Sequence, residues 1–277
     1  MFDITRPEVA YLIGLLQTDG THGGSLDVKG KVTLELAARD EAVLPRLAAV
    51  IPCYTSIRHR TRDTNFSKAY ESVTLSFYDQ DTRKALAALG VPPGRKSRSI
   101  APPRQPFSRA DYVRGVLDGD GSVGFTAKGL PFVSLVTASP ALAEFFCEVL
   151  QEVCGVARTA RQNQRDGVAN IIVVNTAAAK LATWAWYSPD ALSIDRKLRA
   201  ATQVAAWVPD PANAARYDIV RKAWTPEEDQ PIEEHSIAEA AALLGRTEKS
   251  VSARRSRLRG SAARAAWLRS IQEKTIQ

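Results

Sequence analysis

The sequence predicts an α+β protein made of two similar modules, followed by a small domain that contains only helices. A ten-residue phrase occurs twice, as YLIGLLQTDG at residues 11–20 and as YVRGVLDGDG at residues 112–121. Similar helix and strand patterns follow each copy in the same order, which indicates an internal repeat. Beyond residue 208 the strand patterns stop and short helices begin. We therefore expect modules at 1–97 and 98–207, a linker at 208–222 and a helical domain at 223–277.

The composition favours a partner that carries negative charge. The 277 residues have a formal net charge of +7 and an isoelectric point of about 9.4, which is typical of proteins that bind nucleic acid. No apolar run is long enough to span a bilayer, and the first residues lack the features of a signal peptide. The cysteines, Cys53, Cys147 and Cys154, have no CxxC spacing, which argues against a zinc site or a disulfide framework. These features predict a soluble intracellular protein with reduced thiols and no membrane partner.

The first module begins with the helix that carries the first copy of the phrase. Arg6-Pro7-Glu8 favour a helix start, because proline and an acidic residue suit the first turn, and Asp19-Gly20 end the helix. The other predicted elements are strands at 25–28 and 32–36, a helix capped by Asp40, strands at 54–62 and 72–77, and a helix at 81–89. The order is helix, two strands, helix, two strands, helix (αββαββα).

The second module repeats this order after a basic segment at 94–104. Ser108 is the expected cap of the helix that carries the second copy of the phrase. The other predicted elements are strands at 122–126 and 132–137, a helix at 139–153, strands at 156–161 and 169–174, and helices at 177–187 and up to about 204. The sequence thus predicts two pseudo-symmetric αββαββα repeats.

The C-terminal domain has the pattern of a helix-turn-helix unit. Thr225 and Pro226, followed by three acidic residues, favour a first helix start, a second helix is expected at 236–244 before Gly245, and a third from Thr247 to about 259. In such units the last helix enters the major groove of DNA.

The two copies of the phrase each place an aspartate, Asp19 or Asp120, at the end of a helix. A carboxylate there is unfavourable by about 0.3–1 kcal/mol, because the helix dipole is negative at this end. A cation would offset this cost, and two carboxylates with the backbone carbonyls of Gly20 and Gly121 suit Mg²⁺. The alternative is that Asp-Gly only marks a helix stop; the second matching copy favours the metal.

Small residues and basic residues complete the predicted site. Gly14 and Gly115 occupy the same place in the two phrases, so we expect them to let the two helices pack closely. Basic side chains on the strands would follow a phosphate backbone, although a solvated strand face is the alternative. We expect DNA contacts from Lys29, Lys31, Arg58, Arg60, Arg62, Arg158 and Arg161 in the modules, and from Arg246, Lys249, Arg254, Arg255, Arg257 and Arg259 in the helical domain.

Residues 12–20 and 113–121 resemble the two motifs of LAGLIDADG homing endonucleases, and the resemblance covers about residues 1–207. It implies a monomeric, pseudo-symmetric enzyme whose motif helices pack together and whose antiparallel sheets form a saddle over double-stranded DNA. It implies Asp19 and Asp120 as the acids that bind Mg²⁺ or Mn²⁺, and Lys96 and Lys197 as the basic catalytic residues. The implied location is the cytoplasm or nucleoid of a bacterial or phage-infected cell.

The sequence departs from the family pattern at three positions. Gln17 replaces the usual acidic residue of the first motif, and Ala38 and Ala138 stand where a polar, water-ordering side chain is frequent. We therefore expect the half-site served by Asp19 to be cut more slowly. Separately, residues 224–258 are similar to Myb-like (SANT) DNA-binding domains, on the residues Trp224 to Asp229, Leu244 to Thr247 and Leu258.

The hypothesis from the sequence is an endonuclease that makes a double-strand break at a long DNA site by metal-dependent hydrolysis. Two alternatives remain open. The first is a DNA-binding regulator that uses the same scaffold without cutting. The second is a maturase that binds intron RNA and helps it to splice.

Overall fold

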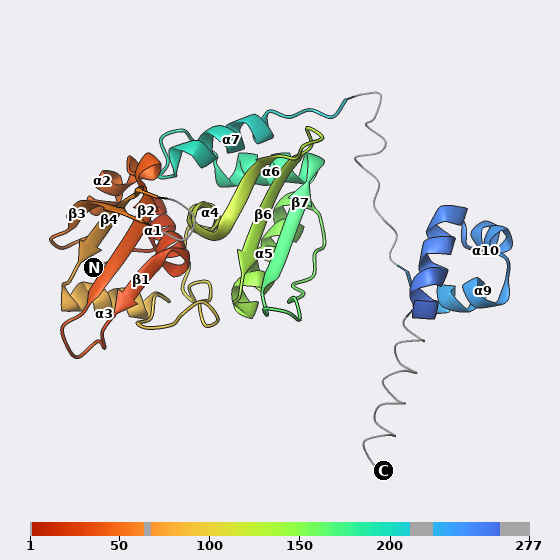
Figure 1. The fold of residues 1–277 in the computed structure, drawn as a ribbon, viewed down its shortest axis with the longest axis horizontal. Helices are drawn as coiled ribbons and strands as arrows, with labels where there is room; N and C mark the ends of the chain where they lie inside the picture. Colours follow the sequence, from red (N-terminus) through yellow and green to blue (C-terminus); the bar gives the residue numbers. More distant parts are fainter. Residues whose placement is uncertain (1, 64–67, 211–223, 261–277) are drawn as a thin grey trace, which may run out of the picture. The chain divides into compact units, whose positions relative to one another are not determined.

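The computed structural model describes residues 2–63, 68–210 and 224–260 (Figure 1). The chain divides into two compact units, Met1–Asp218 and Ile219–Gln277. The first unit has a mixed α+β fold with two antiparallel sheets, and the second is helical in its described residues. No helix among the described residues is long and apolar enough to cross a membrane.

Two helices, α1 (Pro7–Thr18) and α4 (Arg109–Asp120), carry the repeated phrase and pack directly against each other. They lie side by side between the two sheets (Figure 1). Every residue of α1 from Val9 to Gln17 is buried, and α4 is buried from Asp111 to Asp118. Because α1 is covered on all sides, it is apolar around most of its circumference rather than along one stripe. The buried face of α4 also holds charged residues, Asp111, Arg114 and Asp118, and Asp111 pairs with Arg114.

The first sheet has the strand order β1-β2-β4-β3, from β1 (Gly20–Gly23), β2 (Lys31–Ala37), β3 (Ser56–Arg62) and β4 (Tyr70–Phe77). On β2, Val32, Leu34 and Leu36 are buried and alternate with more exposed residues, as in a strand with one face on the core. The short helices α2 (Val43–Ala48) and α3 (Gln80–Ala88) belong to the same module.

Two sequence predictions in this module are wrong. The strand expected at 25–28 is a loop, and the strand begins at Gly20 instead, directly after Asp19. The buried guanidinium of Arg83 donates to the carbonyls of Gly23, at the end of β1, and of Gly24, Ser25 and Val28 beyond it. The last three carbonyls therefore bind a side chain instead of a neighbouring strand. Asp40 does not cap α2; it ends a 3₁₀ turn (Ala38–Asp40), and its carboxylate accepts from Arg196 Nε at 3.0 Å.

The second sheet has the order β5-β6-β7, from β5 (Gly121–Phe125), β6 (Pro131–Thr137) and β7 (Ala169–Val174). The helices of this module are α5 (Pro140–Cys154), α6 (Asn175–Ala185) and α7 (Asp195–Ala205). Gly20 pairs with Leu34 and Gly121 with Leu135. The first two strands of each sheet therefore follow the same offset of 101 positions as the motifs.

The strand predicted at 156–161 is absent, so within the described residues the second module has three strands rather than four. This part of the chain makes only an isolated bridge, from Gln162 to Ala169. Arg158 Nε instead donates to the carbonyl of Ile172 on β7, at 3.1 Å. A side chain thus takes a backbone acceptor that a fourth strand would use, and Arg158 and Arg161 lie on a loop.

The C-terminal unit consists of a 3₁₀ turn (Pro226–Glu228), α9 (Asp229–Glu234), α10 (Ile237–Leu244) and a helix at 248–260. Thr225 and Ser236 each form a capping box with the glutamate three residues later. Gly245 ends α10 with φ 59°, a left-handed conformation that glycine adopts readily. The small core contains Ile232, Ala240, Ala241 and Val251.

Candidate active site at the paired helix ends

The two glycines of the repeated phrase lie where α1 and α4 cross. A Cβ atom built on Gly14 would overlap the carbonyl oxygen of Tyr112, and one built on Gly115 would overlap that of Tyr11. The contact continues to the last turn, where a Cβ on Gly119 would overlap the Thr18 hydroxyl and lie 3.5 Å from the carboxyl carbon of Asp19. The crossing therefore holds the ends of the two helices together, and with them Asp19 and Asp120.

Two tyrosines cross-link the helices in a pseudo-symmetric way. Tyr11 donates its hydroxyl to Asp118 Oδ2 at 2.8 Å, and Tyr112 donates to Gln17 Oε1 at 2.6 Å. All four side chains are buried. Sequence reasoning did not assign these residues to the site, although the tyrosines occupy the first position of both phrases and their partners stand two residues before each aspartate.

The partners of the tyrosines also hold the segments that carry the two lysines. Gln17 Nε2 donates to the carbonyls of Gly90 and Ala101, both at 2.9 Å, on either side of Lys96. Asp118 Oδ2 instead accepts from the backbone N–H of Ile194 at 2.8 Å, three residues before Lys197. The segment around Lys96 offers backbone carbonyls to the motif helix, so the side chain that holds it must donate a hydrogen bond. The segment before Lys197 offers a backbone N–H, so the side chain that holds it must accept one. This difference explains why the first motif has a glutamine where the second has an aspartate.

His22 holds the same first segment from β1. It is 1 % exposed, its ring nitrogen Nδ1 lies 2.8 Å from the carbonyl of Val91, and its own carbonyl accepts from Gly94 N at 2.9 Å. Burial is the main cause that lowers the pKa of His22. This histidine therefore positions the chain that leads to Lys96.

The two lysines are both buried but are bonded differently. Lys197 Nζ donates to the carbonyls of Leu117, Asp118 and Gly121 at 2.8, 2.6 and 2.9 Å, so it caps the C-terminal end of α4. No described residue accepts a hydrogen bond from Lys96 Nζ. Sequence reasoning gave the lysines the same role; the structure leaves the ammonium group of Lys96 free for another anion.

The charges at this site act on one another. Burial and, for Asp19, the nearby charge of Asp120 raise the pKa of each carboxyl. Burial lowers the pKa of Lys96 and Lys197, against the pull of the carboxylates. Among the nearby positive charges, Lys96 lowers the pKa of Asp120 the most, and Lys197 lowers the pKa of Asp19 the most. The carboxylate that acts most strongly on Lys96 is accordingly Asp120 of the other module, whereas the one that acts most strongly on Lys197 is Asp118 of its own module, ahead of Asp19.

Replacing the two lysines by methionine should separate their roles. Lys197→Met leaves several buried carbonyls without a donor, so we expect the free energy of unfolding to fall by about 2–4 kcal/mol. Lys96→Met removes no hydrogen bond and relieves a buried charge, so we expect a change within about 1 kcal/mol. Urea unfolding of both variants measures the difference, and equal losses would contradict the capping role of Lys197.

Asp118 should make stability depend on pH. Burial raises its pKa from 3.8 to about 6 in the folded protein. The unfolded chain therefore loses this proton first as pH rises, and the free energy of unfolding should fall between about pH 4 and pH 6, by roughly 3 kcal/mol in total. Asp118→Asn stays neutral and keeps an acceptor for Tyr11, so the part of the fall that Asp118 causes should be absent, and only the smaller part caused by the raised pKa values of Asp19 and Asp120 should remain. Urea unfolding at pH 4 and pH 7.5 tests it; the same fall in the variant would show that Asp118 is not its cause.

The donor set at the helix ends fits a hard cation such as Mg²⁺. Asp19 and Asp120 reach solvent, and Mg²⁺ binds through one or two carboxylates while it keeps several waters. No group of three or more His, Cys, Asp or Glu side chains in the described ranges is arranged to hold a metal. The carbonyl of Gly121 already accepts from Lys197 Nζ at 2.9 Å, so it is a weaker candidate ligand than that of Gly20.

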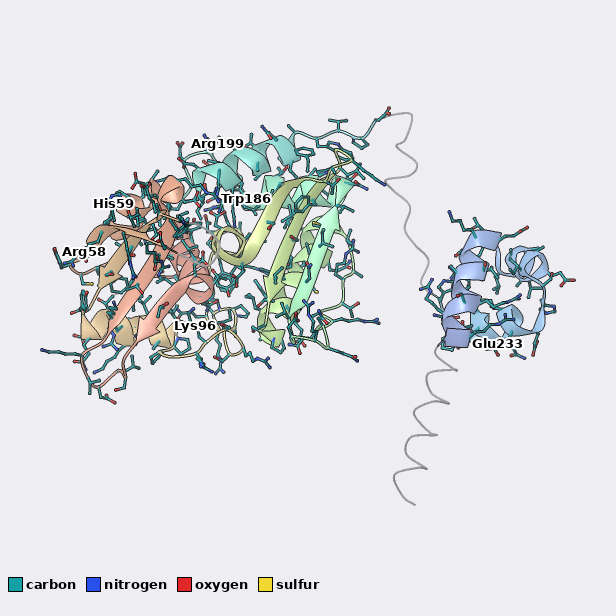
Figure 2. All side chains as sticks on the ribbon, in the orientation of Figure 1. Arg58, His59, Lys96, Trp186, Arg199 and Glu233 are labelled. Carbon is teal, nitrogen blue, oxygen red and sulfur yellow. The ribbon has the colours of Figure 1, made fainter. Side chains whose placement is uncertain are left out.

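The first sheet presents a basic, polar open face. Arg58, Arg60 and Arg62 lie exposed on the edge strand β3, and Arg58 is labelled there in Figure 2. Arg62 pairs with Glu35 at 3.0 Å; among the described residues, no carboxylate pairs with Arg58 or Arg60. Lys29 is exposed in the loop that Arg83 holds, and Lys31 is exposed at the start of β2, directly after this loop. The strand registers place Lys31, Arg58, Arg60 and Arg62 on the same open face of the sheet.

In the C-terminal unit, three of the six basic residues expected to contact DNA have partners within the unit. Arg246 pairs with Glu228 at 2.7 Å and lies over the Trp224 ring, Arg254 pairs with Asp229 at 2.6 Å, and Arg255 donates to the carbonyls of Ile232 and His235. Lys249, Arg257 and Arg259 are exposed on the last helix. Sequence shows charge at these positions but does not show which charges are already paired.

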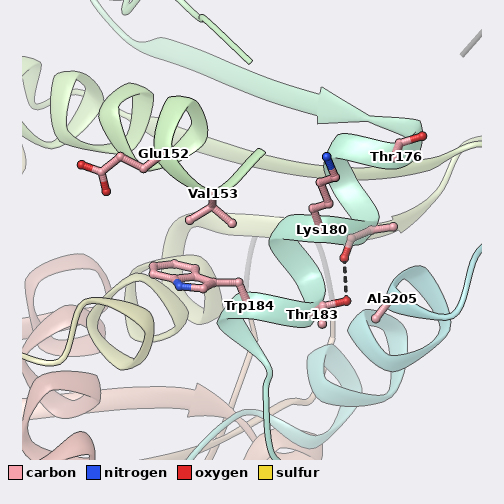
Figure 3. Close-up of a pocket in the computed structure, with 8 residues that line it drawn as sticks. Glu152, Val153, Thr176, Lys180, Thr183, Trp184 and Ala205 are labelled. Atoms are coloured by element: carbon pink, nitrogen blue, oxygen red, sulfur yellow. Dashed lines mark hydrogen bonds between the residues drawn. The ribbon is translucent and has the colours of Figure 1, made fainter. Parts of the chain in front are cut away.

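A cavity of about 690 Å³ lies elsewhere in the second module, between α5, α6 and α7 (Figure 3). Val153, Lys180 and Trp184 are among its lining residues, and Thr183 donates to the carbonyl of Ala179 beside it at 3.0 Å. None of the residues at the paired helix ends lines this cavity. This cavity is therefore separate from the candidate site.

Comparison with known proteins identifies one domain family. The chain is similar in structure to the I-SmaMI LAGLIDADG homing endonuclease bound to cleaved DNA, with 10% identity and a TM-score of 0.46 over 72% of this chain and 87% of that one. It is also similar to the I-LtrWI LAGLIDADG homing endonuclease bound to target DNA, with 10% identity and a TM-score of 0.46 over 73% and 89%. No curated protein matches the sequence. Residues 108–182, which include Asp120, match the LAGLIDADG-like domain model.

Proposed function

We propose that this protein is a site-specific DNA endonuclease that makes a double-strand break at a long, asymmetric target. The observation that carries the proposal is the pair of aspartates at the ends of two crossed helices, each beside a buried lysine. The match of residues 108–182 to the LAGLIDADG-like domain supports it. Two modules with one aspartate each suit the two strands of a duplex.

Asp19 and Asp120 would hold Mg²⁺ or Mn²⁺, with the carbonyl of Gly20 as a further ligand. The bound ion would supply an activated water and stabilise the leaving 3′ oxygen. The chain's own residues set the geometry: Tyr11 and Tyr112 fix the helices, and Gln17 and Asp118 hold the lysine segments. Lys96, with its free ammonium group, would stabilise negative charge on the phosphate during hydrolysis.

The basic face of the first sheet would contact the DNA backbone through Arg58, Arg60 and Lys31. The helical unit would extend the contact through the exposed side of its last helix, which carries Lys249, Arg257 and Arg259. In this Myb-like unit, Arg246, Arg254 and Arg255 would stabilise the fold. The proposed domains are two repeats at 1–97 and 98–207, a linker at 208–222 and the helical domain at 223–277, acting as a monomer.

The test uses the full chain and random DNA. Duplexes that the protein retains in EDTA are selected from a random pool over several rounds, and the selected duplexes are then exposed to Mg²⁺. We expect a common sequence to emerge and both strands to be cut within it only when Mg²⁺ is present. A common sequence that is never cut would favour a non-cleaving regulator. Preferential, salt-resistant binding of structured intron RNA over duplex DNA would favour a maturase.

A further inference from the structure

The strand registers allow a residue-by-residue comparison of the open faces of the two sheets. The pairs Thr33–Ser76 and Ser134–Ile172 are equivalent, because β1-β2 and β5-β6 share an offset of 101 positions and the third strands pair in the same register. Lys31 and Glu35 on β2 accordingly correspond to Phe132 and Val136 on β6. Lys31, Glu35 and Ser76 of the first face are thus replaced by apolar residues on the second, whereas Thr33 and Thr74 correspond to the polar residues Ser134 and Asn170.

The apolar residues of the second face are accessible. Val136, Ile172 and Val174 are 44 %, 45 % and 37 % exposed, and they alternate with core residues along β6 and β7. Ser122, Ser134 and Asn170 are the polar residues between them. The open face of β5-β6-β7 (Figure 1) therefore has no lysine or arginine on its strands.

Basic residues lie beside this face instead. Lys128 is exposed in the turn between β5 and β6, and Arg158 binds the edge of β7 from the 155–168 loop. Arg161 and Arg165 are exposed in the same loop, and Arg165 pairs there with Asp166 at 3.2 Å. An apolar surface with positive charge at its margins is complementary to the major groove, where phosphates form the edges and the thymine methyl group is the apolar feature of the floor.

We propose that the second sheet reads thymine by contacting its 5-methyl group with Val136 and Ile172, supported by Phe132 and Val174. The proposal rests on the proposed function, since it needs a duplex across the two sheets. Under this proposal the two halves of the DNA target are recognised through different groups. The first sheet contacts polar groups and phosphates, whereas binding by the second sheet depends on methyl groups. The half-site of the second sheet should accordingly be rich in thymine at the contacted positions.

The experiment replaces thymine by deoxyuridine, which pairs identically but lacks the methyl group. The full chain binds the duplex selected in EDTA from the random pool, with deoxyuridine placed in one half at a time. We expect about fourfold weaker binding for each contacted methyl group that is removed from one half, and unchanged binding when the other half is substituted. The Val136→Ser, Ile172→Ser double variant should bind the thymine and deoxyuridine forms of the sensitive half equally well. Both positions are exposed, and Ile172→Ser introduces the residue that the first sheet has at Ser76.

Thr33→Ser is the matched control, because it removes a methyl group from the open face of the first sheet and should leave the sensitivity unchanged. A selected duplex that tolerates deoxyuridine in both halves, or binds more weakly by the same factor in both, would overturn this inference and leave the proposed function standing. The inference would also be overturned if the double variant still bound the deoxyuridine form of that half more weakly than the thymine form. If no duplex sequence is enriched, the proposed function itself fails, and the inference fails with it.

Discussion

Replacing Asp120 by asparagine is expected to lower the rate of DNA cleavage by at least about 10²–10³-fold, with little loss of duplex binding. Asparagine has nearly the same shape but no charge, so the metal would lose one of its two carboxylates. Asp120 reaches solvent, but the protein around it partly desolvates its carboxyl group and raises its pKa, which indicates that its charge is costly without a cation. Cleavage of the selected duplex by the purified variant, measured with its affinity in EDTA, checks the prediction.

The two aspartates should have separable effects. If each serves one strand, Asp120→Asn and Asp19→Asn should leave nicks on opposite strands, and the residual nicking should be slower in Asp120→Asn if the half served by Asp19 is the weaker one. Asp190→Asn is the matched control, because Asp190 is exposed beside Pro7, at the other end of α1 from Asp19. Mg²⁺-dependent double-strand cleavage at the normal rate in both variants would rule out the proposed mechanism.

The helix pair and its aspartates were predictable because their signals are local and occur twice. The phrase contains the helix, its glycine contacts and its end, and the second copy is what distinguishes this Asp-Gly from a single, ordinary helix stop. The strand pattern after Asp120 was equally readable, and β5 and β6 lie within a residue or so of their expected positions.

The predictions from sequence that were wrong involve long side chains that hydrogen-bond to backbone groups far away in the sequence. Arg83 holds the loop at 24–28 and Arg158 takes a carbonyl of β7, so two segments with strand-like composition are loops. Gln17 looked like a defect in the motif, but its amide bonds to Gly90 and Ala101, more than 70 positions away. Local patterns contain no information about such partners, because they depend on which segments the fold brings together.

Gly115→Ala is expected to destabilise the protein by about 3 kcal/mol or more. The added Cβ would overlap the carbonyl oxygen of Tyr11 and lie 3.0 Å from Leu15 N. Both neighbours are helix backbone, so no side chain can rotate away, and α1 and α4 must move apart. Because Asp19 and Asp120 stand on these helices, the surviving folded protein should also cleave DNA more slowly.

Gly23→Ala provides the comparison for this variant. It adds the same methyl group on β1, where the nearest atom, the Lys31 carbonyl oxygen, would lie at 3.7 Å, an ordinary contact. Urea unfolding and Mg²⁺-dependent cleavage of the two variants should therefore diverge, with Gly23→Ala close to the unmodified protein in both. If Gly115→Ala unfolded at the same urea concentration as Gly23→Ala, the helices would have to tolerate a wider separation. The close crossing would then not be what holds the two carboxylates together.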